Sequence, residues 1–328
     1  MRVATSPAQL PLPSNLSVVD LAPSVSSLLA EVLCGLAEPG KRLPPKLFYD
    51  ARGVELYNRI CLTQAYYPTR TERDILGRHA RDIAQEVGAG TVVLEPGAGD
   101  MSKIRLLLPR LRPRAYVPID LALAQLRLEA QKLAREWPEL EVMAVGADFY
   151  TPGLQARLLR EPGRKLVFFP GSTIGNFDPP EALAFLRRAR DLAGATGAAL
   201  IGVDLQKPTS ILERAYNDPE GYTARFNLNL LARLNREMGA DFDPGAFRHR
   251  AFYNEAASRI EMHLVSACAQ RVRIAGRSFD FAAGETIHTE NSHKFAVRAV
   301  CDLAREAGFG SVRVWTDPAA WFGVFLLS

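Results

Sequence analysis

The chain has 328 residues, of which 48% are hydrophobic and 23% charged, as in globular proteins that bury a core. Its net charge of +4 comes from lysines and arginines spread along the sequence, so composition does not favour a nucleic-acid binder. Four cysteines lie far apart without a C-x-x-C pair, which argues against a zinc site or a disulfide framework. Neither a signal peptide nor a membrane span is recognisable. We therefore expect a soluble, cytoplasmic protein with no membrane or nucleic-acid partner.

The first ninety residues show mainly helical patterns. The first fifteen or so, rich in proline and serine, are expected to be loosely ordered. Apolar residues recur at helical spacing over residues 24–38, 51–61 and 71–87, and the AYYPTR stretch interrupts the pattern before the last of these. These three segments are predicted to form amphipathic helices.

Strands and helices alternate from about residue 90 to residue 206. Short apolar runs predict the strands, and helical segments of ten or more residues separate most of them; the runs are GTVVLEPGAG, AYVPID, LEVMAVGADF, KLVFFPGS and AALIGVDLQ. This alternation predicts a parallel, doubly wound sheet of the Rossmann-like α/β class. The final stretch, SVRVWTDPAAWFGVFLLS, predicts two more strands that complete the sheet as an antiparallel hairpin.

The alternation stops after Lys207, which indicates a second unit. The next thirty residues look helical, and the segment RIEMHLVSACAQRVRIAG has the alternation of strands. We predict a sheet domain formed by residues 70–206 and 294–328. We predict a second, α+β domain formed by residues 1–69 and the inserted residues 207–293.

A glycine turn, LEPGAG, follows the first strand of the alternation. Gly97 and Gly99 allow the backbone to approach a ligand closely, and the N-terminus of the next helix favours negative charge. A dinucleotide fingerprint needs glycine or alanine where this chain has Ser102, so NAD or FAD is weakly supported. The form E-x-G-x-G is instead the pattern of S-adenosylmethionine (SAM)-dependent methyltransferases.

Carboxylates end the next two strands of the alternation. Asp120 is placed to accept the hydroxyls of a ribose, and Asp148 with Phe149 suits an adenine amino group and ring edge. Each feature alone has an ordinary explanation, as a tight turn or a helix cap. Three successive strand ends with suitable groups favour a methyl-donor site, because ligands bind at this edge of parallel sheets.

Several stretches resemble one family, the histidine Nα-methyltransferases of ergothioneine biosynthesis, which make the trimethylated betaine hercynine. The matching stretches include LFYDARGVELYNRI, AYYPTRTERDIL, LEPGAG, YVPID, FFPGSTIGN, RAYND, RIEMHL, FAAGETIHTENSHKF and WTDP. The resemblance covers nearly the whole chain from about residue 24. One departure is the loop LEPGAG, where the family often has LGSGT; Pro96 stiffens this turn, but its glycines remain.

The resemblance implies a methyltransferase domain, a substrate-binding domain and a set of site residues. SAM is the expected methyl donor, and the turn described above adds Gly99 to the expected donor contacts Tyr49, Gly97, Lys103, Asp120, Asp148 and Phe149. The expected substrate contacts are Tyr66, Asn176, Tyr216, Met262, Glu290 and Ser292. Tyr49 and Asn176 are expected to serve in catalysis.

The roles of these residues follow from their chemistry. Asn176 offers a donor and an acceptor to the amine and carboxylate of an amino acid. Glu290 and Ser292 are two apart, so an extended segment turns both toward one side, where they suit the two nitrogens of an imidazole. Met262 is expected to form a wall of the ring pocket.

Methyl transfer of this kind requires no metal. The five histidines show no metal-like spacing in the sequence; they are His79, His249, His263, His288 and His293. We therefore expect no metal site, and we expect a monomer acting on a small molecule.

Three alternatives remain open. The first keeps the reaction but exchanges histidine for tryptophan or tyrosine. The second is a nucleic-acid methyltransferase, because FDPP resembles the D-P-P-Y motif; Glu181, however, stands where the stacking tyrosine is needed. The third is a non-catalytic protein that binds SAM, against which the apparent completeness of both sites argues.

Overall fold

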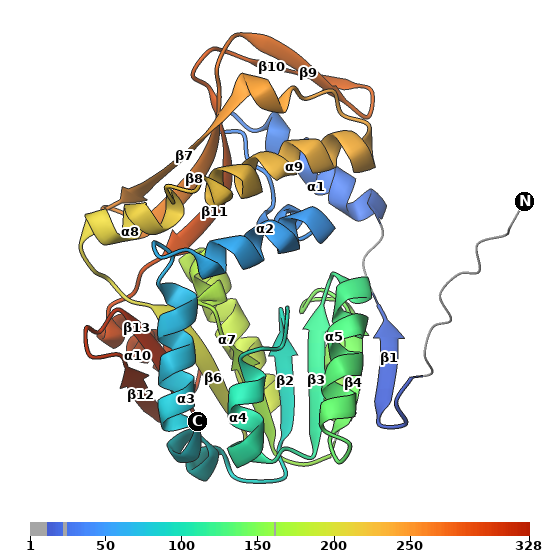
Figure 1. Ribbon diagram of the computed structural model, residues 1–328, viewed down its shortest axis with the longest axis vertical. Helices are drawn as coiled ribbons and strands as arrows, with labels where there is room; N and C mark the ends of the chain where they lie inside the picture. Colours follow the sequence, from blue (N-terminus) through green and yellow to red (C-terminus); the bar gives the residue numbers. More distant parts are fainter. Residues whose placement is uncertain (1–11, 22–24, 161) are drawn as a thin grey trace, which may run out of the picture.

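A computed structural model describes residues 12–21, 25–160 and 162–328. Within these residues, eight strands form a large sheet in the order β1-β4-β3-β2-β5-β6-β13-β12 (Figure 1). Strands β1 to β6 run parallel, whereas β13 is antiparallel to β6 and β12 is antiparallel to β13. The strands are β1 (Leu16–Asp20), β2 (Val92–Pro96), β3 (Ala115–Asp120), β4 (Glu141–Gly146), β5 (Lys165–Phe169), β6 (Ala198–Asp204), β12 (Val312–Thr316) and β13 (Phe322–Leu327).

Helices cover both faces of this sheet. Apolar side chains of α3 (Pro68–Val87), α4 (Ile104–Leu111) and α5 (Leu123–Glu136) share one core with the sheet. Those of α6 (Leu154–Arg160), α7 (Pro179–Ala193) and α10 (Val297–Glu306) pack on the opposite face. Successive residues of a strand point to opposite faces, so Phe168 joins the first core and Phe169 the second. This burial on both sides explains the uninterrupted apolar runs of the central strands.

A second unit lies beyond the carboxyl ends of the parallel strands (Figure 1). Its helices are α1 (Val25–Ala37), η1 (Pro45–Phe48), α2 (Ala51–Leu62), α8 (Thr209–Tyr216), α9 (Tyr222–Met238) and η3 (Pro244–Ala246). Strands β7 (Phe247–Asn254), β8 (Arg259–Ser266) and β11 (Thr286–His293) form an antiparallel sheet in the order β11-β8-β7, and β9 (Gln270–Ile274) pairs with β10 (Arg277–Phe281). A separate apolar core joins these elements, with Phe48 stacked 4.4 Å from Phe226.

The predicted alternation of strands and helices is confirmed, and so is the antiparallel hairpin at the end of the chain. Among the strands of the large sheet and the α-helices that cover it, three were not predicted, namely β1, α6 and α10. Strand β1 lies in the large sheet, where it pairs with β4, although residues 1–69 were assigned to the second unit. The Asn15 side chain holds its start by donating to the carbonyls of Ala134, Trp137 and Leu140.

The loosely ordered segment that we expected at the N-terminus lies largely outside the described residues, as does residue 24, the expected start of the first helix. The division of the chain at residues 69, 206 and 293 remains a prediction. In the part of the chain that the structure describes, no helix is long and apolar enough to cross a membrane.

Candidate active site

The glycine turn lies at the carboxyl edge of β2. Gly97 and Gly99 adopt positive φ angles of 68° and 52°, a conformation that side chains disfavour, so glycine has a backbone reason at both positions. The Gly97 amide donates to the carbonyl of Ile119 at 2.8 Å, which holds the turn against β3. No atom lies within 4 Å of the position a Cβ would take on Gly97, so the turn is open to a ligand.

The acidic residue of the E-x-G-x-G pattern has a structural role. Glu95 is buried and accepts a hydrogen bond of 2.6 Å from the Tyr116 hydroxyl. Its burial raises its pKa to about 8, although the Tyr116 hydrogen bond and Lys103 act in the opposite direction. Glu95 therefore lies beneath the turn, with its side chain held inside the protein.

Asp120 lies directly beside the glycine turn. Its Oδ2 accepts from the Gly99 amide at 3.3 Å, and its Oδ1 accepts from the Ala122 amide at 2.9 Å. The Asp120 carbonyl also accepts from the Ala147 amide at 3.1 Å, which joins this strand end to the one that leads to Asp148. Two carboxylates and an open backbone turn thus share one edge, and this arrangement fits a nucleoside with free ribose hydroxyls.

The remaining predicted donor contacts lie at the same edge but differ in exposure. Asp148 is half-buried, and its Oδ1 accepts from the Tyr150 amide at 2.8 Å. Phe149 is buried and packs 5.2 Å from the Phe185 ring, so it belongs mainly to the core behind the site.

Lys103 links the glycine turn after β2 to the loop after β5 through a buried carboxylate. Its ammonium lies 2.6 Å from Glu72, a carboxylate that is only 1% exposed. Both Glu72 oxygens also lie 2.9 Å from the Gly171 amide, which donates to them. A Cβ on Gly202 would lie 1.9 Å from Glu72, so the carboxylate occupies space that only glycine leaves. Glu72 was not among the predicted site residues, although it belongs to the stretch YYPTRTE.

The loop GSTIGN has packing reasons for its small residues. Gly171 has a φ of 86°, and Ser172 also adopts a left-handed conformation while its Oγ accepts from the Asp204 amide at 2.9 Å. A Cβ on Gly175 would lie 2.8 Å from the carbonyl oxygen of His293 in β11. The 3-10 helix η2 (Thr173–Asn176) therefore packs against the backbone of the second unit, with Asn176 at its end.

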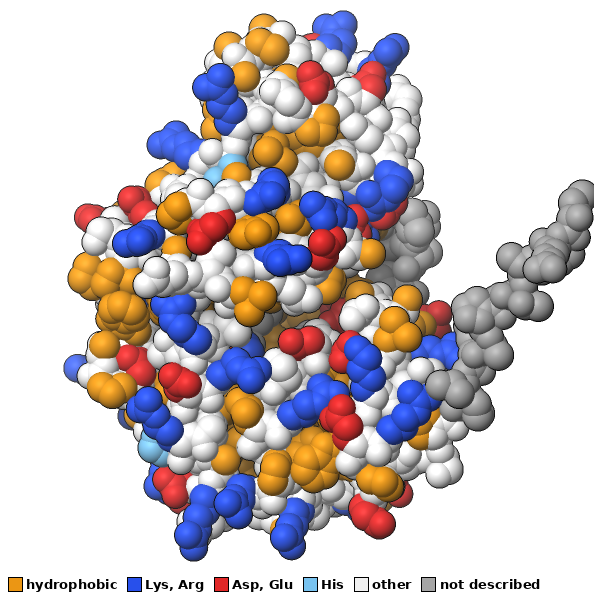
Figure 2. Space-filling view, viewed as in Figure 1, with side chains coloured by type: hydrophobic (Ala, Val, Ile, Leu, Met, Phe, Trp, Pro, Cys, Tyr) orange, Lys and Arg blue, Asp and Glu red, His pale blue; other side chains and the backbone are white. Residues whose placement is uncertain are grey.

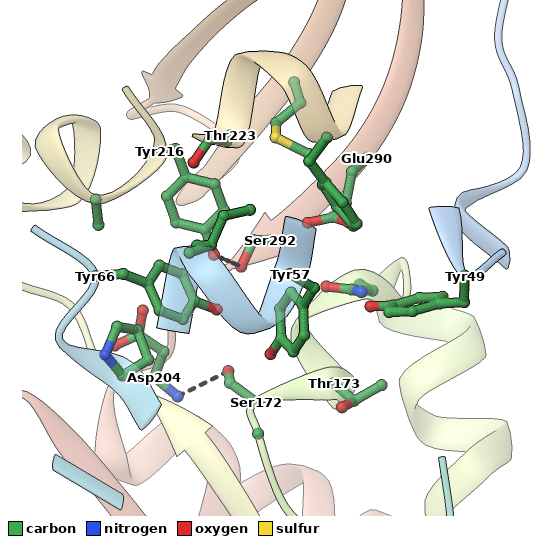
Figure 3. A pocket seen from close by; sticks show the side chains of 17 residues that line it. Tyr49, Tyr57, Tyr66, Ser172, Thr173, Asp204, Tyr216, Thr223, Glu290 and Ser292 are labelled. Carbon is green, nitrogen blue, oxygen red and sulfur yellow. Dashed lines mark hydrogen bonds between the residues drawn. The ribbon is translucent and has the colours of Figure 1, made fainter. Parts of the chain in front are cut away.

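One cavity brings together Tyr49 and all six predicted substrate residues (Figure 3). These residues come from α2–α3, η2, α8, β8, β11 and the turn after η1, so elements of both units enclose the cavity. Five more polar residues that were not predicted also line it, namely Tyr57, Ser172, Thr173, Asp204 and Thr223. Ser172 and Thr173 belong to the quoted stretch FFPGSTIGN, but only the fold shows that these five side chains share a cavity.

A β-bulge turns Glu290 toward this cavity. His288 is paired with His263, and Glu290 is paired with Met262, so Thr289 is an extra residue in β11. Without the bulge, residues 288 and 290 would face the same side; with it, Glu290 faces the cavity together with Met262. Glu290 is 9% exposed, and burial raises its pKa to about 7 while Lys294 opposes that rise.

Three tyrosines surround the space between the donor edge and Glu290. Tyr49 is 38% exposed at the rim and points into the cavity, and burial of its phenol raises its pKa, with Glu290 and Asp120 adding to the effect. Tyr66 makes an edge contact of 6.1 Å with Tyr216, and burial raises the pKa of both. All three are therefore neutral phenols that can donate hydrogen bonds.

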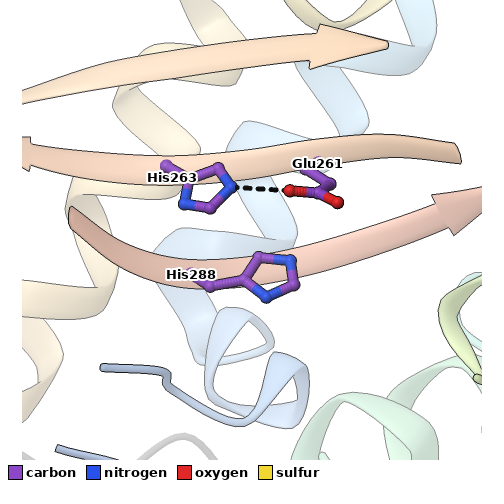
Figure 4. Close-up of side chains that lie close together, drawn as sticks. All are labelled: Glu261, His263 and His288. Carbon is purple, nitrogen blue, oxygen red and sulfur yellow. Dashed lines mark hydrogen bonds and ion pairs between the residues drawn. The ribbon is translucent and has the colours of Figure 1, made fainter. Parts of the chain in front are cut away.

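A cluster of potential metal ligands lies on β8 and β11, contrary to the expectation from histidine spacing (Figure 4). Ligand atoms of Glu261, His263 and His288 all lie within 4.8 Å of one another. The two histidines come together because their strands are adjacent, although they are far apart in sequence.

The geometry of this cluster suits a hydrogen-bonded stack better than a metal centre. The imidazoles of His263 and His288 stack at 4.8 Å with an interplanar angle of 17°, so their in-plane lone pairs do not converge on one ion. Burial alone raises the pKa of Glu261, but hydrogen bonds from His263, Asn254 and Arg259 lower it to about 2. The stack lies on the face of β8 opposite to Met262, and hence away from the cavity.

The parallel sheet, its open glycine turn flanked by acids and the adjoining polar cavity define a SAM-dependent methyltransferase. A family model described as histidine-specific, SAM-dependent methyltransferase matches residues 28–328. The chain belongs to this family.

Curated relatives agree with this assignment. The chain is 42% identical to a histidine N-alpha-methyltransferase of Mycolicibacterium smegmatis, over 92% of this chain and 95% of the relative. It is also 42% identical to the protein of that name from Mycobacterium tuberculosis, over 92% and 94%. A 4-dimethylallyltryptophan N-methyltransferase of Aspergillus fumigatus is 28% identical, over 89% and 91%.

Proposed function

We propose that this enzyme transfers three methyl groups from SAM to the α-amino group of L-histidine and so forms hercynine, the first step of ergothioneine biosynthesis. The names of the two relatives at 42% identity support histidine as the substrate. The observation that carries the proposal is the single cavity in which Asn176, Tyr66 and Glu290 meet. We further propose a cytoplasmic monomer that acts on free amino acids.

The donor site of this proposal lies along the carboxyl edge of β2, β3 and β4. Asp120 holds the ribose hydroxyls, Asp148 holds the adenine amino group, and the open turn at Gly97 and Gly99 lets the amino-acid part lie close to the backbone. Lys103 carries a positive charge to that end, and Glu72 keeps its side chain in position. When bound, the donor supplies an electrophilic methyl carbon on its sulfonium.

The substrate site lies on the second unit's side of this edge. Asn176 holds the amine and carboxylate, and the neutral phenol of Tyr66 donates to the carboxylate, with the ring of Tyr216 packed beside it. Glu290 and Ser292 hold the imidazole, with Met262 as an apolar wall beside them. The charges of Asp120 and Glu290 both raise the pKa of Tyr49, so this residue lies between the donor site and the substrate site. It directs the amine toward the methyl group.

Catalysis in this site is mainly orientation and exclusion of water. An amine attacks only in its unprotonated form, so the substrate's ammonium loses one proton before each of the three transfers. Holding the nitrogen in line with the methyl carbon lowers the entropic part of the barrier, and misplacement by about 1 Å can cost roughly 100-fold. The amine pocket, bounded by Tyr49, Tyr66 and Asn176, must also retain the mono- and dimethyl forms.

Methylation of another aromatic amino acid is the second candidate, and the relative named for a tryptophan derivative motivates it. Glu290 favours a ring with a polar N–H group, because a buried carboxylate left without a hydrogen-bond partner costs ~1–3 kcal/mol. A nucleic-acid substrate has no comparable support. Figure 2 shows lysines and arginines intermingled with acidic side chains on the viewed face, without a continuous basic surface.

The proposal is tested by incubating the purified protein with SAM and equimolar histidine, tryptophan and tyrosine, followed by mass spectrometry. We expect histidine alone to gain three methyl groups, with little accumulation of the mono- and dimethyl forms. A gain on tryptophan or tyrosine in preference to histidine would reject the proposed substrate. Binding of SAM without any methylated product would support a non-catalytic protein instead.

A further inference from the structure

A fully buried lysine lies beneath two hydroxyls of the substrate cavity. Lys294 follows β11, and its side chain is 0% exposed. Its ammonium donates to the Ser292 Oγ at 2.6 Å and to the Tyr216 hydroxyl at 3.2 Å, and it lies 3.0 Å from Asp204 Oδ2. These three partners account for its three N–H groups. Lys294 does not line the cavity, so it acts on a ligand only through these neighbours.

The number of hydrogens available determines whether the Ser292 and Tyr216 hydroxyls can donate to a ligand. An ammonium only donates, so Ser292 and Tyr216 must both accept from Lys294. The two hydroxyls also lie 2.7 Å apart, with Tyr216 donating to Ser292 (Figure 3). The Ser292 oxygen then accepts twice, which uses both of its lone pairs. Its own hydrogen is left to donate into the cavity.

We propose that Lys294 is a positioning residue that makes Ser292 a fixed hydrogen-bond donor, and that this donor selects the unprotonated nitrogen of a neutral imidazole. This inference rests on the proposed methylation of histidine. Glu290 accepts a hydrogen bond from the N–H of the same ring. The cavity thus recognises one donor and one acceptor on the imidazole. The two residues lie on one face of β11, roughly 7 Å apart along the strand, which matches an imidazole hydrogen-bonded at each nitrogen.

The buried charges around Lys294 keep this arrangement in place. Asp204 is 1% exposed and accepts hydrogen bonds from the Tyr67 hydroxyl at 2.7 Å and from Lys207 at 2.6 Å. Burial alone lowers the pKa of Lys294, but Asp204 and Tyr216 raise it above its ordinary value. The ammonium therefore remains charged and cannot become an acceptor.

The inference predicts a specific form of substrate discrimination. An indole carries an N–H but no acceptor nitrogen, so it leaves the Ser292 hydrogen unpaired inside the protein. The same holds for the two isomers of pyrrolylalanine, in which one imidazole nitrogen is replaced by C–H and the other keeps its hydrogen. We expect the wild-type enzyme to prefer histidine over the better pyrrole isomer by roughly 10- to 100-fold in kcat/KM.

The test compares this preference in two lysine variants. Lys294→Met leaves the Ser292 hydroxyl free to rotate and accept, so we expect the preference for histidine to fall below about threefold, mainly through KM. Lys207→Met is the matched control, because it removes the other lysine paired with Asp204 without touching Ser292 or Tyr216. We expect this control to keep the wild-type preference. Thermal melts of both variants verify folding.

Each outcome of this test is decisive. A folded Lys294→Met enzyme with the full preference for histidine would overturn the inference, as would an equal loss in both lysine variants. If Lys294→Met does not fold, Tyr216→Phe decides, because it also frees one of the two lone pairs of Ser292 and lets the hydroxyl accept. Tyr216→Phe should then lower the preference for histidine, and a full preference would overturn the inference. Absence of histidine methylation by the wild-type enzyme would reject the proposed function itself.

Discussion

The donor edge and the substrate cavity are built in different ways. The proposed donor edge consists of consecutive strand ends of one parallel sheet, with an open turn at Gly97 and Gly99. The substrate cavity depends on side chains from segments as distant as Tyr49 and Ser292. A site of the first kind follows from topology, whereas a site of the second kind depends on how two units pack. Variants should therefore separate donor binding from substrate binding.

The largest effect is expected from Asn176→Ala. The variant loses the group proposed to orient the amine, so kcat/KM for histidine should fall roughly 100-fold or more. Donor affinity measured by calorimetry should stay within about twofold, because Asn176 lies outside the glycine turn. Asn58→Ala, at an exposed position of α2, is the control and should behave as wild type. Equal losses in donor affinity and in turnover would contradict the separation of the two sites.

Asp120→Ala should weaken donor binding and leave histidine binding nearly unchanged, the opposite of Asn176→Ala. Removal of the carboxylate beside Gly99 eliminates the proposed ribose contacts, and we expect donor affinity to weaken about 30-fold. The KM for histidine, measured at saturating donor, should change little. Asp191→Ala removes an exposed carboxylate of α7 and provides the comparison. Unchanged donor affinity in Asp120→Ala would remove the basis for the assigned donor edge.

Glu290→Ala combined with Met262→Val should change the ring preference of the cavity. The double variant lacks the acceptor for a ring N–H and has a larger cavity, so kcat/KM for histidine should fall about 10-fold. Use of tryptophan or tyrosine should improve at the same time. Kinetics with the three amino acids provide the measurement. If all three rates stayed as in the wild type, the ring pocket would have to lie elsewhere.

The smallest effect concerns stability and pH. The pKa of Glu290 is raised by burial from 4.5 to about 7, so between these values the folded state binds more protons than the unfolded state. Stability should therefore decrease as pH rises from 5 to 7, by up to about 1 kcal/mol per pH unit from this group. Glu290→Gln removes that contribution, and urea denaturation of the ligand-free protein at several pH values measures it. An unchanged slope would show that Glu290 is solvated.

Much of the donor edge could be predicted from the sequence, because strand periodicity and a glycine turn are local signals. The buried partners of that edge could not. Glu72 contacts Lys103 and the amide of Gly171 in the loop after β5, and periodicity alone treats it as another polar position. Strand β1 was missed because five residues of mixed burial at a sheet edge carry little pattern.

The proposed substrate residues were predicted through family resemblance, since no spacing joins Tyr66 to Glu290. The expectation that Glu290 and Ser292 share a face agrees with the pairing of β11, in which both lie beyond the bulge. The same alternation would also place His288 on that face, and the extra residue Thr289 prevents this. The histidine stack was missed for a related reason, because strand pairing brings distant histidines together.

The close approach of Gly175 to His293 has a consequence for how such enzymes can change their substrate. A Cβ at this glycine would collide with the backbone of β11, so the segments that bear the proposed amine-binding and ring-binding groups are in contact without intervening side chains. The distance between those groups is consequently a fixed dimension of the scaffold. New substrate specificities should arise by substitution of side chains while this backbone contact stays unchanged. Amino acids with a longer spacer between the α-nitrogen and the ring should be poor substrates.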